Sequence, residues 1–310
     1  MKKHILFLIM FVFAISCSKE KNKDYNLIHD RLSFKNMSEF NTSYLMLSKM
    51  TSKEELQFWA QTKNHSTLLN SNDTNIEQYS NVLKTILNKD SEYELGDSII
   101  WFNNGNLYAF AKNEQANISA LKTNPNKCHL MGYVSLSIIE NSKLKSANLG
   151  LHGLDARNQK TLYEQYYQPC GGNLIAHTGM RKYVHEIYDE SIAASGVIQS
   201  HLHLRIKLEY QGSKGWKAAS ELTEINVNVV SGSYMYPSGE PKPMQPPPYH
   251  AFSEYHNCSG TLDIMLLNVN DSNNQYWVVS IEGSIYQKIM GDVDTNAWTD
   301  DGIKHDGVLW

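Results

Sequence analysis

The stretch that decides the fold is His201-Leu202-His203-Leu204-Arg205-Ile206-Lys207-Leu208-Glu209-Tyr210. Its apolar residues, Leu202, Leu204, Ile206 and Leu208, occupy every second position. A period of two predicts a β-strand that turns one face toward the core, because successive side chains of a strand point to opposite sides. We expect this strand at the centre of a mainly antiparallel sheet or sandwich, with the intervening polar residues on its other face.

Other segments show the same strand character. They are residues 92–95, 99–102, 107–111, 131–139 and 225–229, and Asn104-Gly105 predicts a hairpin turn between the second and the third. Residues 261–269 and 276–285 are expected to form an antiparallel pair across a polar turn. Six of the eight prolines lie within residues 237–248, so this segment is predicted to be an extended loop, since proline cannot donate to a sheet.

The chain before residue 90 has helical character instead. Ser38 can cap a helix that carries Phe40 and Tyr44, and residues 51–54 have the form of a capping box before a second helix. A third helix is expected over residues 75–87, and further helices within 155–168 and over 180–188. The predicted fold class is α+β, with short N-terminal helices packed on a mainly antiparallel β-sheet or β-sandwich.

The N-terminus has the features of a bacterial lipoprotein signal. Lys2 and Lys3 precede an apolar run over residues 5–15, whose last two residues begin the stretch Ala14-Ile15-Ser16-Cys17. This is a charged region, a short apolar region and a small-residue cleavage site before a cysteine that would be diacylated. The run is too short to cross a bilayer, which takes about 20 residues. We expect a signal peptide over 1–16, a flexible tether over 17–30, a helical region over 31–90 and a mainly β domain over 91–310.

Lipidation of Cys17 predicts where the protein resides. We expect it in the cell envelope, anchored in the bilayer through acylated Cys17, with the outer membrane as the favoured membrane and the periplasmic or surface face left open. The formal net charge of −4 argues against a nucleic-acid partner, because such a partner requires a basic surface. No cofactor is predicted.

Three cysteines remain besides the lipidated one: Cys128, Cys170 and Cys258. An oxidising compartment permits one disulfide and leaves one thiol unpaired. The spacing does not choose among the three pairings. Gly-containing turns beside Cys170 and Cys258 favour that pair, and leave Cys128 as a buried free thiol.

Three groups of segments together resemble a family. They are residues 32–69; residues 86–90 with Leu95-Gly96-Asp97; and residues 181–184 with residues 205–210 and Gly215-Trp216. This combination resembles an uncharacterised family of Bacteroidota lipoproteins, a domain of unknown function, over most of the mature chain. The resemblance implies lineage, lipidation and envelope location, and it implies no site residues.

Two sets of residues could bind a metal. His201 and His203 share one face of their strand, as paired ligands in β-sheets do, but Arg205 and Lys207 share that face, and a solvent-facing polar stripe is the favoured interpretation. The second set resembles a calcium loop of the D-x-D-x-N type: Asp292, Asp294, Asn296 and Asp300. Ala297 stands where that loop has glycine and Ile303 where it has glutamate, so a polar turn is favoured there.

No catalytic motif stands out. His185-Glu186 lacks the second histidine of a zinc-protease motif, and no nucleophile elbow or phosphate-binding loop is present. The proline-rich segment is bordered by aromatic residues suited to recognition: Tyr234, Tyr236, Tyr249, Phe252 and Tyr255. The predicted function is a non-catalytic envelope lipoprotein that binds a glycan or a protein partner. The alternative is a secreted hydrolase with an unrecognised active site.

Overall fold

The computed structural model describes residues 30–50, 52–71, 74–138, 157–194, 197–235, 242–243, 251–271 and 277–309. Residues Arg31–Trp310 form one compact unit. The predicted signal peptide, the tether before Asp30 and Cys17 lie outside the described residues. No helix in the described ranges is long and apolar enough to span a bilayer.

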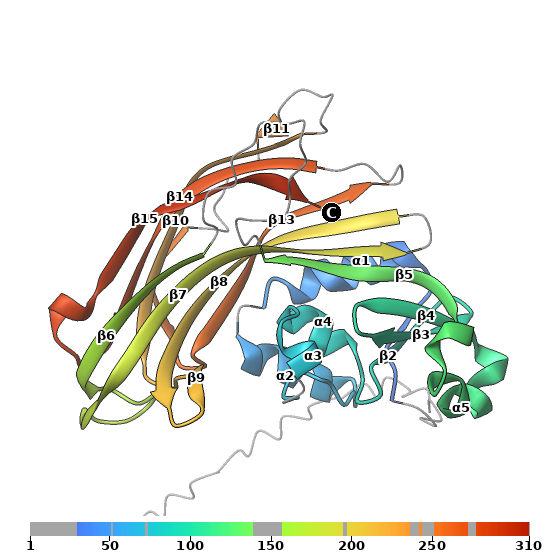
Figure 1. Cartoon of the computed structure of the whole chain (residues 1–310), viewed down its shortest axis with the longest axis horizontal. Coiled ribbons are helices and arrows are strands. Elements are labelled where there is room, and N and C mark those ends of the chain that lie inside the picture. Colours follow the sequence, from blue (N-terminus) through green and yellow to red (C-terminus); the bar gives the residue numbers. More distant parts are fainter. Residues whose placement is uncertain are drawn as a thin grey trace, which may run out of the picture. The chain divides into compact units, whose positions relative to one another are not determined.

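Within these residues, strands far outnumber helices (Figure 1). The helices are α1 (Met37–Leu47), α2 (Lys53–Thr62), α3 (Thr74–Glu77), α4 (Asn81–Ile86) and α5 (Ile118–Lys122), with 3-10 turns η1 (Lys112–Asn117), η2 (Pro125–Lys127) and η3 (Asp294–Asn296). The strands are β1 (Ser33–Phe34), β2 (Glu92–Leu95), β3 (Ser98–Asn103), β4 (Asn106–Ala111), β5 (His129–Ile138), β6 (Arg157–Tyr167), β7 (Ile175–Ala194), β8 (Val197–Gly212), β9 (Gly215–Ala218), β10 (Thr223–Met235), β11 (Lys242–Pro243), β12 (Ala251–Asn257), β13 (Thr261–Asp271), β14 (Trp277–Ile289) and β15 (Trp298–Leu309).

The larger sheet has ten described strands in the order β1-β2-β3-β4-β5-β7-β8-β13, with β6 on β7 and β9 on β8. Only the β1–β2 pair in it is parallel among the described strands. Strand β7 is 20 residues long, so one edge of it takes two partners, β6 along its first part and β5 along its last. Strand β8 pairs with the other edge of β7.

The second sheet has five described strands, in the order β11-β10-β14-β15 with β12 on β10. An apolar core joins the two sheets face to face. Leu202, Leu204 and Ile206 of β8 belong to it together with Ile225 of β10 and Ile281 of β14. The alternation of the 201–210 segment is confirmed, and its leucine face is the face that meets the second sheet.

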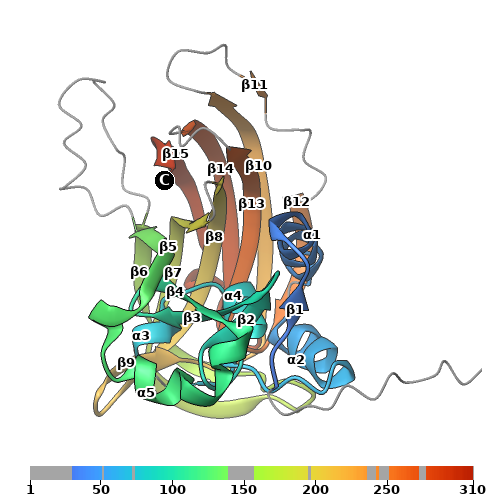
Figure 2. The ribbon, with the colours of Figure 1, turned by 90° about the vertical axis from the view of Figure 1, so that its right-hand side faces the viewer.

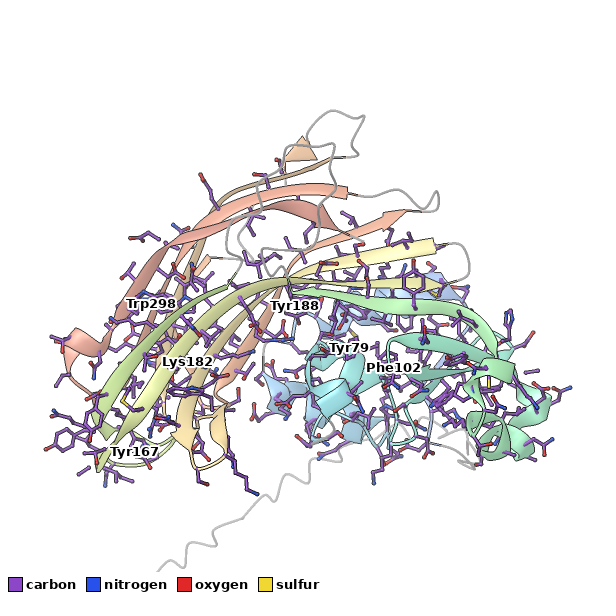
Figure 3. The ribbon with its side chains drawn as sticks, viewed as in Figure 1. Tyr79, Phe102, Tyr167, Lys182, Tyr188 and Trp298 are labelled. Atoms are coloured by element: carbon purple, nitrogen blue, oxygen red, sulfur yellow. A yellow bond between two sulfur atoms is a disulfide. The ribbon has the colours of Figure 1, made fainter. Side chains whose placement is uncertain are left out.

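The N-terminal helices gather against the part of β7 and β8 that lies away from β6 and β9 (Figures 1 and 2). A second core forms there from apolar residues of α1, α4 and strands β2 to β4, among them Phe40, Tyr44, Leu83 and Ile100. Tyr79 contacts Phe102 edge to face, with ring centroids 4.9 Å apart (Figure 3). Burial of these side chains is what holds such short helices in place, because isolated helices of this length are unstable in water.

The α+β class expected from the sequence is wrong: the described chain is a β-rich fold of two sheets with a few short helices. Two of the expected helices are strands. Residues 157–167 form β6, and residues 180–188 lie inside β7. Tyr is frequent in both segments, with Thr161 in the first and Val184 and Ile187 in the second, and these residue types favour the pleated, half-buried surface of a sheet.

Capping residues were predicted to within two positions. The capping box of α2 is formed by Ser52 and Glu55, one residue later than the expected 51–54 box, and Asn36, not Ser38, caps α1. The expected 75–87 helix is interrupted, because Ser80 caps α4 as a new start. Asn104 and Gly105 both have positive φ, at 49° and 81°, as the turn of the β3–β4 hairpin requires. The expected 261–285 pair is wrong, since β13 pairs with β8 whereas β14 pairs with β10 and β15.

Candidate functional site

A cluster of buried polar side chains lies where the helices meet the larger sheet. Its members come from five elements or their caps: Tyr44, Ser80, Glu186, Tyr188, Glu190, His201, His203, Arg205 and Asp263. Charged residues are almost never fully buried unless they are paired. We call these nine residues the polar cluster, and they are the candidate functional site.

The register of the strands brings the cluster together. His201, His203 and Arg205 alternate with the leucines of β8 and so share the face that looks away from the second sheet. Strand β7 places Glu190 opposite His201 and Tyr188 opposite His203. The expected solvent-facing stripe is therefore wrong: His201 and His203 are 0% and 2% exposed, because helices cover this face of the sheet.

Glu190 is tied to the helices by three hydrogen bonds. Its carboxylate accepts from the Tyr44 hydroxyl at 2.5 Å, and from the Ser80 hydroxyl and backbone N–H at 2.8 Å each. Ser80 is the N-cap of α4. Burial, and after it the Glu190 carboxylate, raises the pKa of Tyr44 well above its usual value. The phenol therefore stays protonated and donates.

Asp263 is the second anionic centre of the cluster. It accepts from the Tyr188 hydroxyl at 2.6 Å, from His203 Nδ1 at 2.9 Å and from the Arg205 guanidinium at 3.2 Å. Burial opposes ionisation, but Arg205, followed by His203 and Tyr188, outweighs it and holds the pKa of Asp263 well below its usual range. The Arg205 guanidinium lies 4.0 Å from the Tyr188 ring centroid and also contacts Glu186 at 3.3 Å.

In both histidines, one ring nitrogen makes a hydrogen bond and the other makes none among the described residues. His201 Nδ1 lies 3.1 Å from the Glu190 carbonyl oxygen, and His203 Nδ1 lies 2.9 Å from Asp263 Oδ1. Neither oxygen can donate, so both Nδ1 atoms carry the proton. Both Nε2 atoms are buried and have no hydrogen-bond partner among the described residues. An unsatisfied buried polar atom costs about 1–3 kcal/mol, so a lone pair left on each Nε2 calls for an explanation.

The rings themselves are fixed by stacking. Tyr44 stacks on His201 with centroids 3.9 Å apart, and Tyr188 stacks on His203 at 4.9 Å (Tyr188 is labelled in Figure 3). Burial, and after it His203, lowers the pKa of His201 well below its usual value. His201 is therefore neutral at physiological pH, with its Nε2 lone pair available.

Glu190, His201 and His203 each place one potential ligand atom within 4.8 Å of the others, and no other such group of three occurs in the described part of the chain. A cavity of about 10 Å³ borders the cluster at Ser80, His203 and Asp263, which is roughly the room of one water molecule. A small-molecule site typically takes about 300 Å³ or more, so this cavity fits an ion or a water and no organic substrate.

The residues of the expected calcium loop are not brought into one site. Asp292 accepts from the Asn296 side-chain amide at 2.6 Å, and Asp294 pairs with Lys288. Asp300 accepts instead from His185 Nδ1 at 2.9 Å, and from Asn158. Their oxygens serve separate polar contacts around the 290–300 turn.

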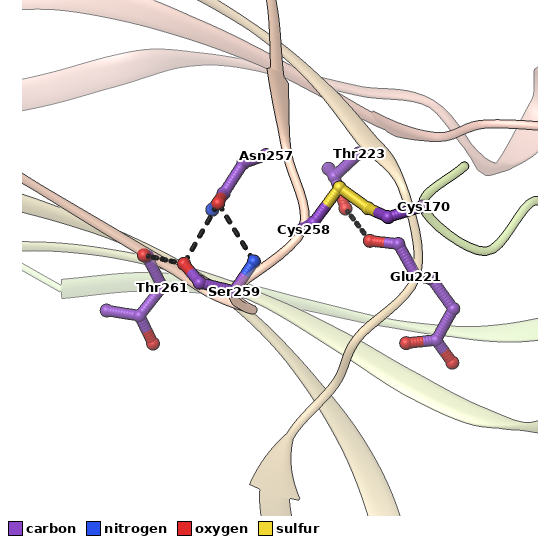
Figure 4. Close-up of a disulfide and its surroundings, with 7 residues drawn as sticks. All are labelled: Cys170, Glu221, Thr223, Asn257, Cys258, Ser259 and Thr261. Atoms are coloured by element: carbon purple, nitrogen blue, oxygen red, sulfur yellow. Dashed lines mark hydrogen bonds between the residues drawn. A yellow bond between two sulfur atoms is a disulfide. The ribbon is translucent and has the colours of Figure 1, made fainter. Parts of the chain in front are cut away.

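Cys170 and Cys258 form a disulfide in the structure, with Cα atoms 6.0 Å apart (Figure 4). This is the pair that the Gly-containing turns favour. Cys128 has a free thiol, as expected, but it is half-buried and not buried, and it donates to the Leu121 carbonyl at 3.4 Å. Cys170 lies in the connection between β6 and β7, so the bond fixes that connection to the end of β12.

Beside this disulfide, large apolar side chains are exposed. Of eight exposed large hydrophobic residues in the described ranges, five gather at the β6–β7 connection and the neighbouring 291–293 turn, each 43–57% exposed: Tyr163, Tyr166, Leu174, Ile175 and Val293. A Cβ added to Gly291 would lie 2.3 Å from Leu174 Cδ1, which shows that the two segments touch. We call these five residues the tip surface, and Tyr167 marks its end of β6 in Figure 3.

The aromatic residues predicted for recognition are only partly described. Tyr236 and Tyr249 lie outside the described residues, and Tyr234 and Phe252 belong to β10 and β12. Tyr255 is half-buried against the core between the sheets. Sequence reasoning missed Tyr44, Ser80, Glu190 and Asp263, which reach His201 and His203 only through the pairing of β7, β8 and β13 and the docking of the helices.

Comparisons with known proteins identify neither a family nor a function for the chain. No family model matches the chain, and a search of the curated proteins gives no match. A solved structure that is similar is that of a DUF4848 family protein from Bacteroides thetaiotaomicron, with 12% identity over 87% of this chain and 95% of that chain. Its TM-score is 0.19, so it carries no argument about fold or function.

Proposed function

We propose that the chain is a lipid-anchored protein of the bacterial cell envelope that binds a protein partner through the tip surface and catalyses no reaction. The single observation that supports this function is the gathering of most exposed large hydrophobic residues of the described chain at one end of β6 and β7. Contiguous apolar patches on otherwise polar surfaces mark interaction sites.

The segments beside the tip surface are joined to one another. Three backbone hydrogen bonds of 2.8 Å each connect Gln168 to Met290, Met290 to Leu222 and Leu222 back to Gln168. The disulfide of Cys170 adds a covalent constraint. A surface that is already ordered loses little conformational entropy on binding, and so retains more of its interaction energy as affinity.

The composition of the patch favours a protein over a glycan. Two tyrosines could stack on sugar rings, but Leu174, Ile175 and Val293 offer only aliphatic contact, which suits an apolar protein surface. A hydrolase, the alternative, would need a substrate-sized cleft with converging polar groups. The polar cluster adjoins only about 10 Å³ of space, so binding is the better supported activity.

Lipid anchoring predicts the behaviour of a Cys17→Ala variant. Without the thiol there is no acceptor for the diacylglycerol, and we expect the protein to remain unprocessed by the lipoprotein peptidase or to appear in the aqueous phase. Detergent-phase partitioning and intact-mass measurement of the two proteins test this. A variant that is still processed normally and still partitions with detergent would refute the anchor.

The partner surface is tested by substituting its aliphatic centre. In Leu174→Ser/Ile175→Ser we expect binding of the partner to weaken about tenfold or more, since each truncation removes a contact worth on the order of 1 kcal/mol at an interface. A photo-crosslinking residue at position 174 identifies the partner in cells, and titration of the purified partner measures the dissociation constant.

Phe58 provides the matched control, because it is 69% exposed on α2. Crosslinking from position 58 and the Phe58→Ser variant should yield no partner and no change in affinity. Equal crosslinking from both positions would argue against the tip surface. Loss of binding to an envelope polysaccharide in the double variant, with no protein adduct, would show that a glycan is the ligand.

A further inference from the structure

We propose that Glu190, His201 and His203 bind a zinc ion, at a position where the ion joins the larger sheet to helices α1 and α4. This site goes beyond the proposed function, because it lies in the polar cluster and not at the tip surface. Three ligand atoms that lie close together, their free lone pairs, the groups that orient them and the local charge support this site.

The three ligand atoms are already close. One potential ligand atom of each residue lies within 4.8 Å of the other two, so some point lies within about 2.8 Å of all three, against zinc bonds of about 2.0–2.2 Å. Side-chain shifts of less than about 1 Å therefore complete three of the four tetrahedral positions. The adjoining cavity, which is bordered by His203 but by neither Glu190 nor His201, has room for about one water molecule.

Both imidazoles are oriented as ligands. In metal sites, the nitrogen that does not bind the ion usually donates to a carbonyl or a carboxylate, which fixes the tautomer and the ring. Here His201 Nδ1 donates to the Glu190 carbonyl and His203 Nδ1 donates to Asp263. The two Nε2 lone pairs remain buried without a partner among the described atoms, and an ion satisfies both at once.

Hydrogen bonds also orient the carboxylate of Glu190. Its Oε1 accepts two hydrogen bonds, from Tyr44 and Ser80, whereas Oε2 accepts one, from the Ser80 backbone N–H. A carboxylate offers about four lone-pair positions, so Oε2 keeps one for the ion. The donors all come from the helical layer, which means that an ion on Glu190 also strengthens the attachment of α1 and α4.

The charge around the site suits a cation. Arg205 and Lys207, which on the sequence argue against a metal, are both engaged: Arg205 with Asp263 and Glu186, and Lys207 with Glu186 at 2.7 Å. The Lys84 ammonium also interacts with Arg205, Asp263 and Glu190, so three cations balance the carboxylates of Glu186, Glu190 and Asp263. A divalent ion would therefore not add to an existing excess of positive charge.

The ligand types select the metal. Two imidazoles and one carboxylate suit zinc and its first-row neighbours, whereas calcium and magnesium prefer oxygen ligands throughout. The site is closed by Tyr44 and Tyr188, whose rings stack on the two histidines. The site is buried and has little solvent space, so an ion bound there joins the sheet to the helices, and its binding free energy contributes to folding.

The experiment uses the full chain extracted from cells in detergent without chelator. Elemental analysis should find about one zinc per chain, and removal of the ion with a chelator should lower the melting temperature, with full recovery on addition of Zn²⁺ alone. His201→Asn and His203→Asn remove Nε2 but keep an amide N–H near the Nδ1 position, so both can fold. We expect each to weaken zinc affinity about 100-fold or more and to abolish the zinc-dependent rise in melting temperature.

His256→Asn is the matched control, since His256 is an exposed histidine of β12, and it should bind zinc as the unaltered chain does. Hydrogen exchange should show faster exchange in α1 and α4 after metal removal, and little change at the tip. A chain without metal whose melting temperature is indifferent to Zn²⁺ would overturn the proposal, with water then occupying the Nε2 positions. Unchanged zinc affinity in both asparagine variants, or a preference for Ca²⁺, would overturn it equally.

Discussion

Replacing Arg205 by methionine is expected to lower the free energy of unfolding by about 3–5 kcal/mol. The guanidinium is the shared partner of Asp263 and Glu186 and also donates to the Gln78 carbonyl. Methionine keeps much of the volume but leaves two carboxylates without this counter-charge in the interior. Denaturant unfolding of the variant and the unaltered chain at pH 7 measures the difference.

The pH dependence of this variant separates charge from packing. With Arg205 present, the lowered pKa of Asp263 adds stability that is complete above the unfolded carboxyl pKa of about 3.9 and is lost as the pH falls through the folded value. Without Arg205, burial is less opposed and the pKa of Asp263 rises. The folded variant then takes up a proton that the unfolded chain does not, so its deficit should be smaller at pH 5 than at pH 7. A deficit that is equal at both pH values would contradict the electrostatic explanation.

Lys112→Met is the control for an ordinary ion pair. Lys112 contacts Glu94 at 2.8 Å, and its side chain is 40% exposed. Exposed pairs contribute roughly 0–1 kcal/mol, so this variant should unfold almost as the unaltered chain does. If Lys112→Met cost as much as Arg205→Met, burial of the polar cluster would not be the source of the effect.

The strand at 201–210 could be predicted from its alternation, but the environment of its polar face could not. A polar residue at every second position is typical of a solvated face, and the same pattern occurs here beneath a layer of helices. What distinguishes the two cases is tertiary contact, such as the Tyr44 ring on His201. Local sequence carries no record of that contact, because the partners lie more than 150 residues apart.

Glu190 could not be placed from the sequence, because the sequence predicts a helix over residues 180–188 where the structure has β7. With β7 read as a strand, the dipeptide Ser195-Gly196 would have indicated a turn before β8, and the register Ala194 to Val197 places Glu190 opposite His201. The error in one element therefore concealed the third ligand. Capping and turn residues, by contrast, act within three or four positions, so the sequence predicts the Asn104-Gly105 turn and places the capping box of α2 within one residue of its position at Ser52 and Glu55.

Leu204→Ala should destabilise the protein by about 2–5 kcal/mol, through lost burial and the cavity left behind. Leu204 is 1% exposed and lies in the core between the two sheets, with Ile187 and Ile264 in the same cluster. Its neighbours in β7 and β13 are Ile187 and Ile264 in register, so both adjoining strands lose a contact. The change in unfolding free energy from denaturant titration, with the slope of the transition unchanged, measures it.

Two substitutions on the same strand calibrate this loss. Ile206→Val removes one methyl group from the same core and should cost about 0.5–1.5 kcal/mol, whereas Gln211→Ala at the exposed end of β8 should stay within about 0.5 kcal/mol of the unaltered chain. The order Leu204, Ile206, Gln211 follows from the amount of buried apolar surface removed. If Leu204→Ala cost no more than Gln211→Ala, the leucine face of β8 would not be packed between the sheets, and the polar cluster on its reverse would lose the rigid strand that positions His201 and His203.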